Sequence, residues 1–263
     1  RDLRMSRGLG DVYKRQFNYK GENVMFYFPG GGSYLYILLL IMIITNIMTG
    51  RVDLLGLVLS IPGVLIAITF HEYAHALAAV KLGDETPKMQ GRLSLNPLSH
   101  LDPIGIVMLI FAHIGWGKPV QINPRNFKGR VSMSAAEAIV SVAGPLMNFI
   151  LALVFSLIFA ALVTFVPTIW TMANGIITTV ILNIIIVNIG LGVFNLIPLP
   201  PLDGSKILAH FLPVNARRWF IEHENIFYIA FIVIWLTPIA SSITSPIINA
   251  ILGALLNIGF AIF

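Results

Sequence analysis

The chain has 263 residues, of which 57% are hydrophobic, 11% are charged and none is cysteine. About a quarter of the residues of a soluble domain are charged, so this composition excludes a soluble globular protein and indicates an integral membrane protein. The absence of cysteine excludes disulfides, thiolate metal sites and cysteine nucleophiles.

Residues 1–16 share nothing with the rest of the chain and are predicted to be a non-native scar, such as a translated sequencing adapter. They hold five basic and two acidic residues, so only +2 of the formal net charge of +5 belongs to the remainder. That charge is too small to indicate nucleic-acid binding. We expect residues 17–33 to be an N-terminal lead-in and residues 34–263 to form one polytopic membrane domain.

Six apolar segments are each predicted to cross the bilayer as a helix, because a span needs about 20 mostly apolar residues. These segments are residues 34–49, 54–81, 135–166, 174–197, 225–240 and 246–262. The predicted fold is therefore an all-α membrane protein with about six transmembrane helices.

The connection between the second and third spans contains a shorter apolar stretch, Ile104–Ile114, which suits a re-entrant segment. On either side of it, Gly91–Leu95 and Val120–Asn123 alternate as short strands do, so the connection is expected to resemble a β-hairpin. One hypothesis is that a strand edge here pairs with an extended substrate. The alternative is an interfacial loop that only caps the site.

Basic residues predict the orientation of the spans. The connections near 82–134 and 205–224 are rich in lysine and arginine, whereas residues 167–173 and 241–245 have none. With six spans, the positive-inside rule places the rich connections and both termini on the cytoplasmic side.

An H-E-x-x-H pattern, His71-Glu72-Tyr73-Ala74-His75, lies near the cytoplasmic end of the second span. On a helix, residues i and i+4 share a face, so both imidazoles can bind one Zn²⁺. Glu72 projects about 100° away from His71, where it can act as a base toward a water on the metal. The alternatives are a chance pentapeptide or two core histidines that neighbouring groups satisfy.

Catalytic zinc sites have three protein ligands and an open position, so a third ligand is required. Asp203 is the other carboxylate embedded in apolar sequence, within Asn195–Gly204. Pro198, Pro200 and Pro201 prevent a regular helix here, and non-helical backbone at membrane depth occurs where it lines a cavity. The alternative is that Asp203-Gly204 forms an ordinary turn.

The motifs His71–His75, Ala143–Asn148 and Asn195–Gly204, in this order, resemble those of the site-2 protease family of intramembrane zinc metalloproteases. The loop strings Gly91–Pro103 and Gly115–Pro124 extend the resemblance, which runs from about Ser33 to Phe263. It implies the short form of the family, without a PDZ domain.

The resemblance implies one Zn²⁺ per chain held by His71, His75 and Asp203, with Glu72 as general base and proton shuttle. Asn195 matches the asparagine expected to stabilise the oxyanion; its alternative role is to close the broken helix backbone. We interpret Asn148 as an interhelical hydrogen-bonding residue outside the catalytic set. His100 is expected either at the cavity mouth or in a solvated loop.

The expected function is hydrolysis of peptide bonds in or near the transmembrane segments of membrane-protein substrates, with the zinc-bound water activated by Glu72. The active-site end is expected to face the cytoplasm of a prokaryotic cell. Two alternatives stay open: a metal or proton transporter, because broken helices and buried charge also mark transport sites, and a catalytically inactive membrane scaffold. The expected partners are the substrate and the lipid bilayer, without nucleic acid, and the sequence predicts no particular oligomeric state.

Overall fold

The computed structural model describes residues 45, 54–102, 105, 117–129, 131–235 and 237–263, and within them the fold is all-helical, as predicted. The α-helices are α3 (Leu54–Lys81), α4 (Thr86–Met89), α6 (Met133–Phe165), α7 (Ile176–Asn195), α8 (Asp203–Phe211), α9 (Val214–Glu222), α10 (Glu224–Trp235) and α11 (Pro238–Ile262). The predicted scar, lead-in, first span and re-entrant stretch lie outside the described residues, except for Thr45 and Gly105.

Within the described residues, four helical segments are long and apolar enough to cross a membrane, so the chain is a multi-pass membrane protein. They are Leu55–Lys81, Met133–Phe165, Met172–Asn195 and Pro238–Ile262. Large apolar side chains such as Ile150 on α6 and Ile243 on α11 are exposed on the outside of the bundle. A lipid environment accounts for these exposed faces, because hydrocarbon tails solvate them.

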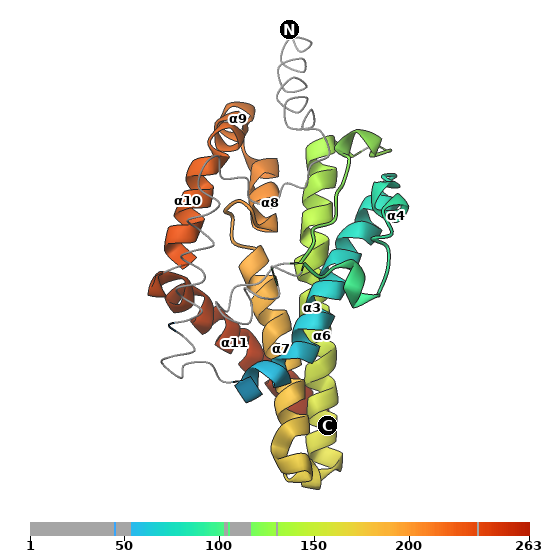
Figure 1. Ribbon diagram of the computed structural model, residues 1–263, viewed down its shortest axis with the longest axis vertical. Coiled ribbons are helices and arrows are strands. Elements are labelled where there is room, and N and C mark those ends of the chain that lie inside the picture. The colour runs from blue at the N-terminus through green and yellow to red at the C-terminus, as the bar shows by residue number, and fades with distance from the viewer. Residues whose placement is uncertain (1–44, 46–53, 103–104, 106–116, 130, 236) are drawn as a thin grey trace.

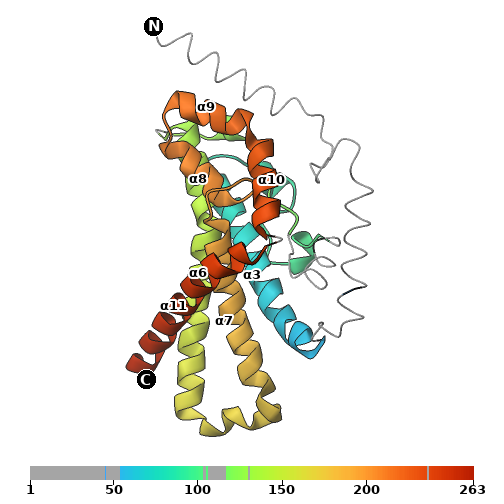
Figure 2. The same cartoon turned by 90° about the vertical axis from the view of Figure 1, so that its left-hand side faces the viewer.

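Three of these helices, α3, α6 and α7, pack against one another, and α3 and α11 both run obliquely to α6 (Figures 1 and 2). The buried cluster between α6 and α7 consists of Ala152, Phe159, Ile185, Ile189 and Val193. Gly63 of α3 lies against α7, where an added Cβ would be 3.1 Å from the Asn183 carbonyl oxygen. Small residues at such crossings let helix backbones approach closely in membranes.

The prediction for the last two spans was wrong. Residues 241–245, expected to connect two spans, lie inside α11, while α10 has only 12 residues. The hydroxyls of Ser241, Ser242 and Thr244 donate to main-chain carbonyls of their own helix at 2.8–2.9 Å. This satisfies their polar groups in an apolar environment, so a polar run need not interrupt the helix.

The expected position of the C-terminus was also wrong. Phe263 packs against Phe165 with ring centroids 5.9 Å apart, and Phe260 packs against Phe159. Both contacts lie toward the Phe165 end of α6, away from its first residue, Met133. The short α10 followed by the long α11 carries the chain to the end of the bundle opposite to the predicted one (Figure 2).

The expected β-hairpin-like connection is absent from the part of the chain that the structure describes. Residues 91–102 and 117–129 contain an isolated antiparallel bridge, Leu101 to Gly117, but no strand. The side chains of Asn96 and Asn123 accept hydrogen bonds from Leu98 N and Arg125 N, and each starts a short 3₁₀ turn at the following proline. These Asn-Pro turns end the extended runs before they can form a ladder.

Candidate metal centre

The predicted ligands come together at one end of the bundle. α3 contributes His71 and His75, which lie one turn apart on the face turned toward α6. The helical path breaks between Asn195, the last residue of α7, and Asp203, the first residue of α8, as the three prolines predicted. Asp203 thereby reaches the two histidines, and all three side chains are buried.

Three potential ligand atoms converge within this group. His71 Nε2 lies 3.2 Å from Asp203 Oδ2, and His75 Nε2 lies 3.1 Å from the same oxygen. The two Nε2 atoms are 3.0 Å apart. Each residue therefore presents one ligand atom to a common point.

The opposite nitrogen of each ring is held by a hydrogen-bond acceptor. His75 Nδ1 lies 2.7 Å from the main-chain carbonyl oxygen of Val140 on α6, which can only accept, so Nδ1 carries the proton. His71 Nδ1 lies 2.7 Å from Asn148 Oδ1 and donates to it in the same way. In the neutral rings, both Nε2 atoms then present a lone pair to the common point.

This donor set fits zinc. Two neutral imidazoles and a carboxylate are a recognised ligand set of catalytic zinc, and ligating histidines usually donate their other N–H to an oxygen. Tetrahedral coordination with bonds of the usual length places ligand atoms about 3.3 Å apart, close to the separations here. Without a cation the three lone pairs would repel one another, so the arrangement favours a bound metal ion.

Glu72 lies outside this group of three ligands but next to it on α3. Its side chain is partly buried, and its Oε2 accepts a hydrogen bond from the Val120 main-chain N–H at 2.9 Å. Gly117 also lies close, since a Cβ there would be 3.8 Å from Glu72 Oε1. The loop at residues 117–123 therefore holds the carboxylate beside the ligands.

Two other residues singled out from the sequence are not among the ligands. The Asn195 amide donates from Nδ2 to the Leu191 carbonyl of its own helix at 3.0 Å. His100 is fully buried rather than solvated, and its Nε2 lies 2.7 Å from the Ser94 carbonyl oxygen. Its main-chain oxygen accepts from Lys118 N at 2.7 Å, which joins the two loop strings.

The close packing of α6 on the ligands depends on Gly144. An added Cβ at this position would be 2.6 Å from His75 Cε1 and 2.7 Å from His71 Cε1. Gly204 is similarly confined, because its Cβ would be 2.6 Å from the carbonyl carbon of Leu196. Gly144 therefore lets the α6 backbone approach the two histidines, and Gly204 lets the start of α8 approach the loop that follows α7.

A fully buried carboxylate, Asp84, ties α3 to the loop that contacts Glu72. Its Oδ2 accepts from Asn123 N at 2.6 Å, and its Oδ1 accepts from Asn126 Nδ2 and from the N–H and hydroxyl of Thr86. Burial raises the pKa of this carboxyl, but the hydrogen bonds from Thr86, Asn123 and Asn126 outweigh burial and hold the pKa below its ordinary value.

Replacing Asp84 by Asn should therefore weaken the fold most at neutral pH. The lowered pKa means that ionised Asp84 stabilises the folded state above the unfolded-state pKa of about 3.9, and that this contribution disappears as pH falls through the folded-state pKa. We expect Asp84→Asn to cost about 1–3 kcal/mol at pH 7, because donors lose their acceptor, and to cost less below pH 4. Thermal unfolding in detergent across this pH range measures the difference. Exposed Glu85 provides the control Glu85→Gln, and an equal loss in both variants would contradict the assignment.

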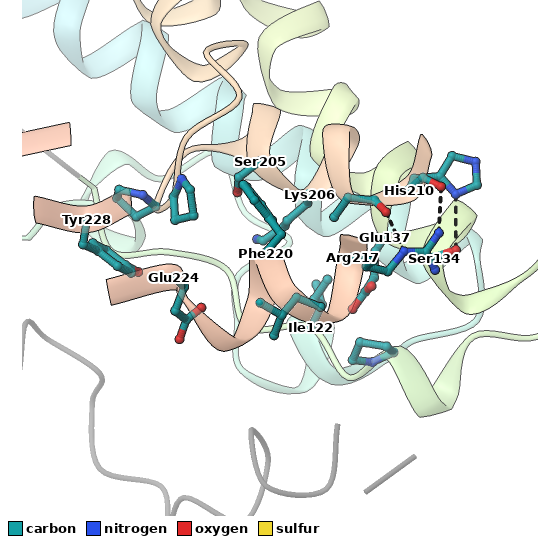
Figure 3. A pocket seen from close by; sticks show the side chains of 15 residues that line it. Ile122, Ser134, Glu137, Ser205, Lys206, His210, Arg217, Phe220, Glu224 and Tyr228 are labelled. Atoms are coloured by element: carbon teal, nitrogen blue, oxygen red, sulfur yellow. Dashed lines mark hydrogen bonds between the residues drawn. The ribbon is translucent and has the colours of Figure 1, made fainter. Parts of the chain in front are cut away.

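A cavity of about 360 Å³ lies beside the metal group, between the start of α6 and helices α8, α9 and α10 (Figure 3). Its lining combines apolar side chains, such as Ile122 and Phe220, with Lys206, Arg217 and Glu224. Ser205 lines it only two residues after Asp203, but the three ligands do not. The cavity is therefore a neighbouring space and not the metal centre itself.

The grouping of His71, His75 and Asp203 was predictable from the sequence, but their hydrogen-bond partners were not. Asn148 was interpreted as interhelical bonding alone, and its contact with His71 was missed. The Val140 carbonyl and the Val120 N–H belong to the backbone, which no residue type reveals. The sequence did offer one signal for the partner of His71: Asn148 and Asn188 are amide side chains within otherwise apolar spans.

Comparisons with known proteins agree with this geometry. Residues 60–237 match the model of peptidase family M50. The chain is 36% identical over 199 residues to the "Putative zinc metalloprotease YwhC" of Bacillus subtilis (strain 168), which covers 76% of this chain and 90% of that protein. It is 29% identical over 187 residues to the "Putative zinc metalloprotease Rip2" of Mycolicibacterium smegmatis, with 69% and 68% covered. No solved structure matches the chain significantly. This multi-pass membrane protein, with its His-His-Asp group, therefore belongs to peptidase family M50, the site-2 protease-like zinc metalloproteases.

Proposed function

We propose that this protein is an intramembrane zinc endopeptidase that hydrolyses peptide bonds in or near the transmembrane segments of membrane-protein substrates. The observation that carries the proposal is the buried group of two imidazoles and one carboxylate between helices of a multi-pass bundle, with a second carboxylate beside it. A site built between membrane-spanning helices suits a substrate that is itself in the membrane. We assign this activity to a single domain, residues 34–263.

In this proposal His71, His75 and Asp203 hold one zinc ion per chain. Bound zinc supplies Lewis-acid chemistry, which acidifies a water molecule and polarises the scissile carbonyl. Glu72 accepts the proton of the attacking water and returns it to the leaving nitrogen. The Val120 N–H holds one oxygen of Glu72, which leaves the other oxygen available for the proton.

Asn195 is the proposed donor to the negative charge that develops on the scissile carbonyl oxygen. One of its two amide N–H groups is used by the Leu191 carbonyl. The second N–H is the group that would donate to the substrate. Asn195 begins the break between α7 and α8, so a small rotation of its side chain is not opposed by a following helical turn.

We further propose that the metal end of the bundle faces the cytoplasm of a prokaryotic cell. Lys81, Lys88 and Arg92 lie at the end of α3 that carries His75, whereas the connection between α6 and α7 has no lysine or arginine. The positive-inside rule makes the basic end cytoplasmic. The bacterial sources of the relatives support a prokaryotic cell membrane. Water and protons would then reach Glu72 from the cytoplasm.

Reversible removal of the metal tests the proposed function. We expect purified protein in detergent to contain about one zinc ion per chain and to cleave a model substrate with a single transmembrane span. A strong chelator should reduce cleavage to background, and added zinc should restore it, because the ligand group by itself supplies no Lewis acid. Elemental analysis and gel electrophoresis of the substrate provide the two measurements.

The same experiment separates the alternatives. Protein that holds its full zinc content but never cleaves the substrate would favour a transporter or an inactive scaffold. Uptake of zinc by proteoliposomes would then distinguish a transporter from a scaffold. Cleavage that persists after complete removal of the metal would contradict the proposal directly.

A further inference from the structure

Two asparagine side chains are fully buried where α3, α6 and α7 meet: Asn148 on α6 and Asn188 on α7. Burial of an amide in an apolar environment destabilises the fold unless its donors and acceptors are paired. The hydrogen-bond partners of the two amide groups therefore indicate their role.

The two amides form a chain of hydrogen bonds that ends at a metal ligand. Asn188 Nδ2 donates to the Ile184 carbonyl at 2.8 Å, and Asn188 Oδ1 accepts from Asn148 Nδ2 at 3.0 Å. Asn148 Nδ2 also donates to the Ala67 carbonyl of α3 at 3.1 Å. Asn148 Oδ1 is then left facing His71 Nδ1 at 2.7 Å.

The donor and acceptor roles in this series of hydrogen bonds follow from the two main-chain carbonyls that take part in it. The carbonyls of Ile184 and Ala67 can only accept, so the amide nitrogen of each asparagine must face them. Each amide oxygen therefore points the other way, and Asn148 presents an acceptor to His71. His71 must carry its proton on Nδ1, which leaves the Nε2 lone pair directed at Asp203 and His75.

The two histidines are oriented by different kinds of hydrogen-bond acceptor. Val140 supplies a main-chain carbonyl to His75, and no side chain can be exchanged there. For His71 the same task falls to a side chain whose own orientation depends on two partners. The tautomer of His71 is thus set by residues on all three packed helices.

We propose that Asn148 is a positioning residue for the metal ligand His71, and that Asn188 acts through Asn148 by holding its amide in the required orientation. The proposal rests on the metal site assigned under the proposed function. Among the described residues, the hydrogen-bond partners of the two asparagines do not include the Asp203 carboxylate; in this proposal both act on the ring orientation and tautomer of His71.

The proposal predicts an order of zinc affinities. Asn148→Leu removes the acceptor for His71 and should weaken zinc binding by about 10–100-fold, as loss of an outer partner of a ligating histidine does. Asn148→Asp still accepts from Nδ1 and should bind zinc more tightly than Asn148→Leu. Asn188→Leu should have a smaller effect than Asn148→Leu, because the Ala67 carbonyl still orients Asn148.

Non-additivity tests whether Asn188 acts through Asn148. If it does, the double variant Asn148→Leu/Asn188→Leu should bind zinc as weakly as Asn148→Leu alone, because Asn188 then has no Asn148 amide to orient. Independent structural roles would instead give losses that add. The double variant thus measures the coupling of the two residues in zinc affinity, and thermal unfolding of the same metal-free variants shows whether the fold gives the same coupling.

The experiment uses the purified full chain in detergent. Zinc affinity is measured by competition with a chromogenic chelator, and Co²⁺ substitution reports the ligand geometry through its visible absorption. Ser156→Ala is the control, because Ser156 is fully buried about two turns further along α6 but donates to its own helix at Leu153. Thermal unfolding of the metal-free variants separates loss of fold from loss of affinity.

Each outcome has a distinct meaning. Unchanged affinity in Asn148→Leu overturns the proposal, as do equal losses in Asn148→Leu and Asn148→Asp. Additive losses overturn the role of Asn188. If Asn148→Leu fails to fold, the Asn148→Asp and Asn188→Leu variants still test the proposal, since each must show a Co²⁺ spectrum or zinc affinity different from that of Ser156→Ala. Wild-type protein that binds no zinc would instead refute the metal site and the proposed function together.

Discussion

Replacing Glu72 by Gln should lower the rate of substrate cleavage by about 10²–10⁴-fold, the usual contribution of a general base, while the protein keeps about one zinc ion per chain. Glutamine preserves the size of the side chain and can still accept the hydrogen bond from Val120 N–H. It cannot accept a proton from water. The three proposed ligands, His71, His75 and Asp203, are not changed, so zinc content should not change.

Zinc content and cleavage must be measured on the same preparations of wild type and Glu72→Gln. Glu85→Gln serves as the matched control, because Glu85 is an exposed carboxylate outside the span that pairs with Lys88. It should cleave at the wild-type rate. Cleavage that survives in Glu72→Gln would exclude Glu72 as the base, and loss of zinc would make it a ligand instead.

Gly144→Ala should strongly weaken zinc binding without unfolding the protein. Its methyl carbon would lie 2.6–2.7 Å from ring carbons of His75 and His71, where carbon atoms in contact need about 3.5 Å. The rings can move away only by breaking their bonds to Val140 and Asn148. We expect zinc affinity to fall by more than about 100-fold, beyond the loss of one outer partner, and cleavage to fall with it.

The helix itself should tolerate the change, because alanine favours a helix over glycine by about 1 kcal/mol. Gly190→Ala on α7 is the control, since its nearest neighbour would be Ile248 Cδ1 at 3.9 Å, an ordinary contact. The measurements are zinc titration and thermal unfolding of the metal-free protein. Wild-type zinc affinity in Gly144→Ala would show that α6 can shift away from the histidines at little cost.

The bounds of α3, α6 and α7 were predictable from the sequence, whereas the bounds of the two C-terminal helices, α10 and α11, were not. α3, α6 and α7 begin and end within a few residues of the predicted bounds, and the break before Asp203 follows from its prolines. Residues 241–245 were expected to connect two spans. In the fold they lie inside α11, and the hydroxyls of Ser241, Ser242 and Thr244 donate to main-chain carbonyls of that helix, which pairs these polar groups locally.

The prediction of short strands at Gly91–Leu95 and Val120–Asn123 was wrong because it considered the alternation of residues alone. Alternation of residues describes which side chains could face one way, but a strand also needs a partner in register. Asn96 and Asn123 instead turn the chain into 3₁₀ segments. The loop at residues 117–123 instead contacts Glu72 through the Val120 main-chain N–H and contacts Asp84 through the Asn123 main-chain N–H.

The sequence by itself determined which residues form the candidate ligand group and which carboxylate we propose as the base. The spacing of His71, Glu72 and His75 sets their directions through the geometry of a single helix, and few other ionisable groups lie in apolar sequence. Only the tertiary structure decided which nitrogen of each histidine faces the metal position. That choice depends on the Val140 carbonyl and the Asn148 amide, which come from another helix. Helix periodicity is local, but the rotation and crossing of packed helices depend on the whole bundle, and they decide which groups meet.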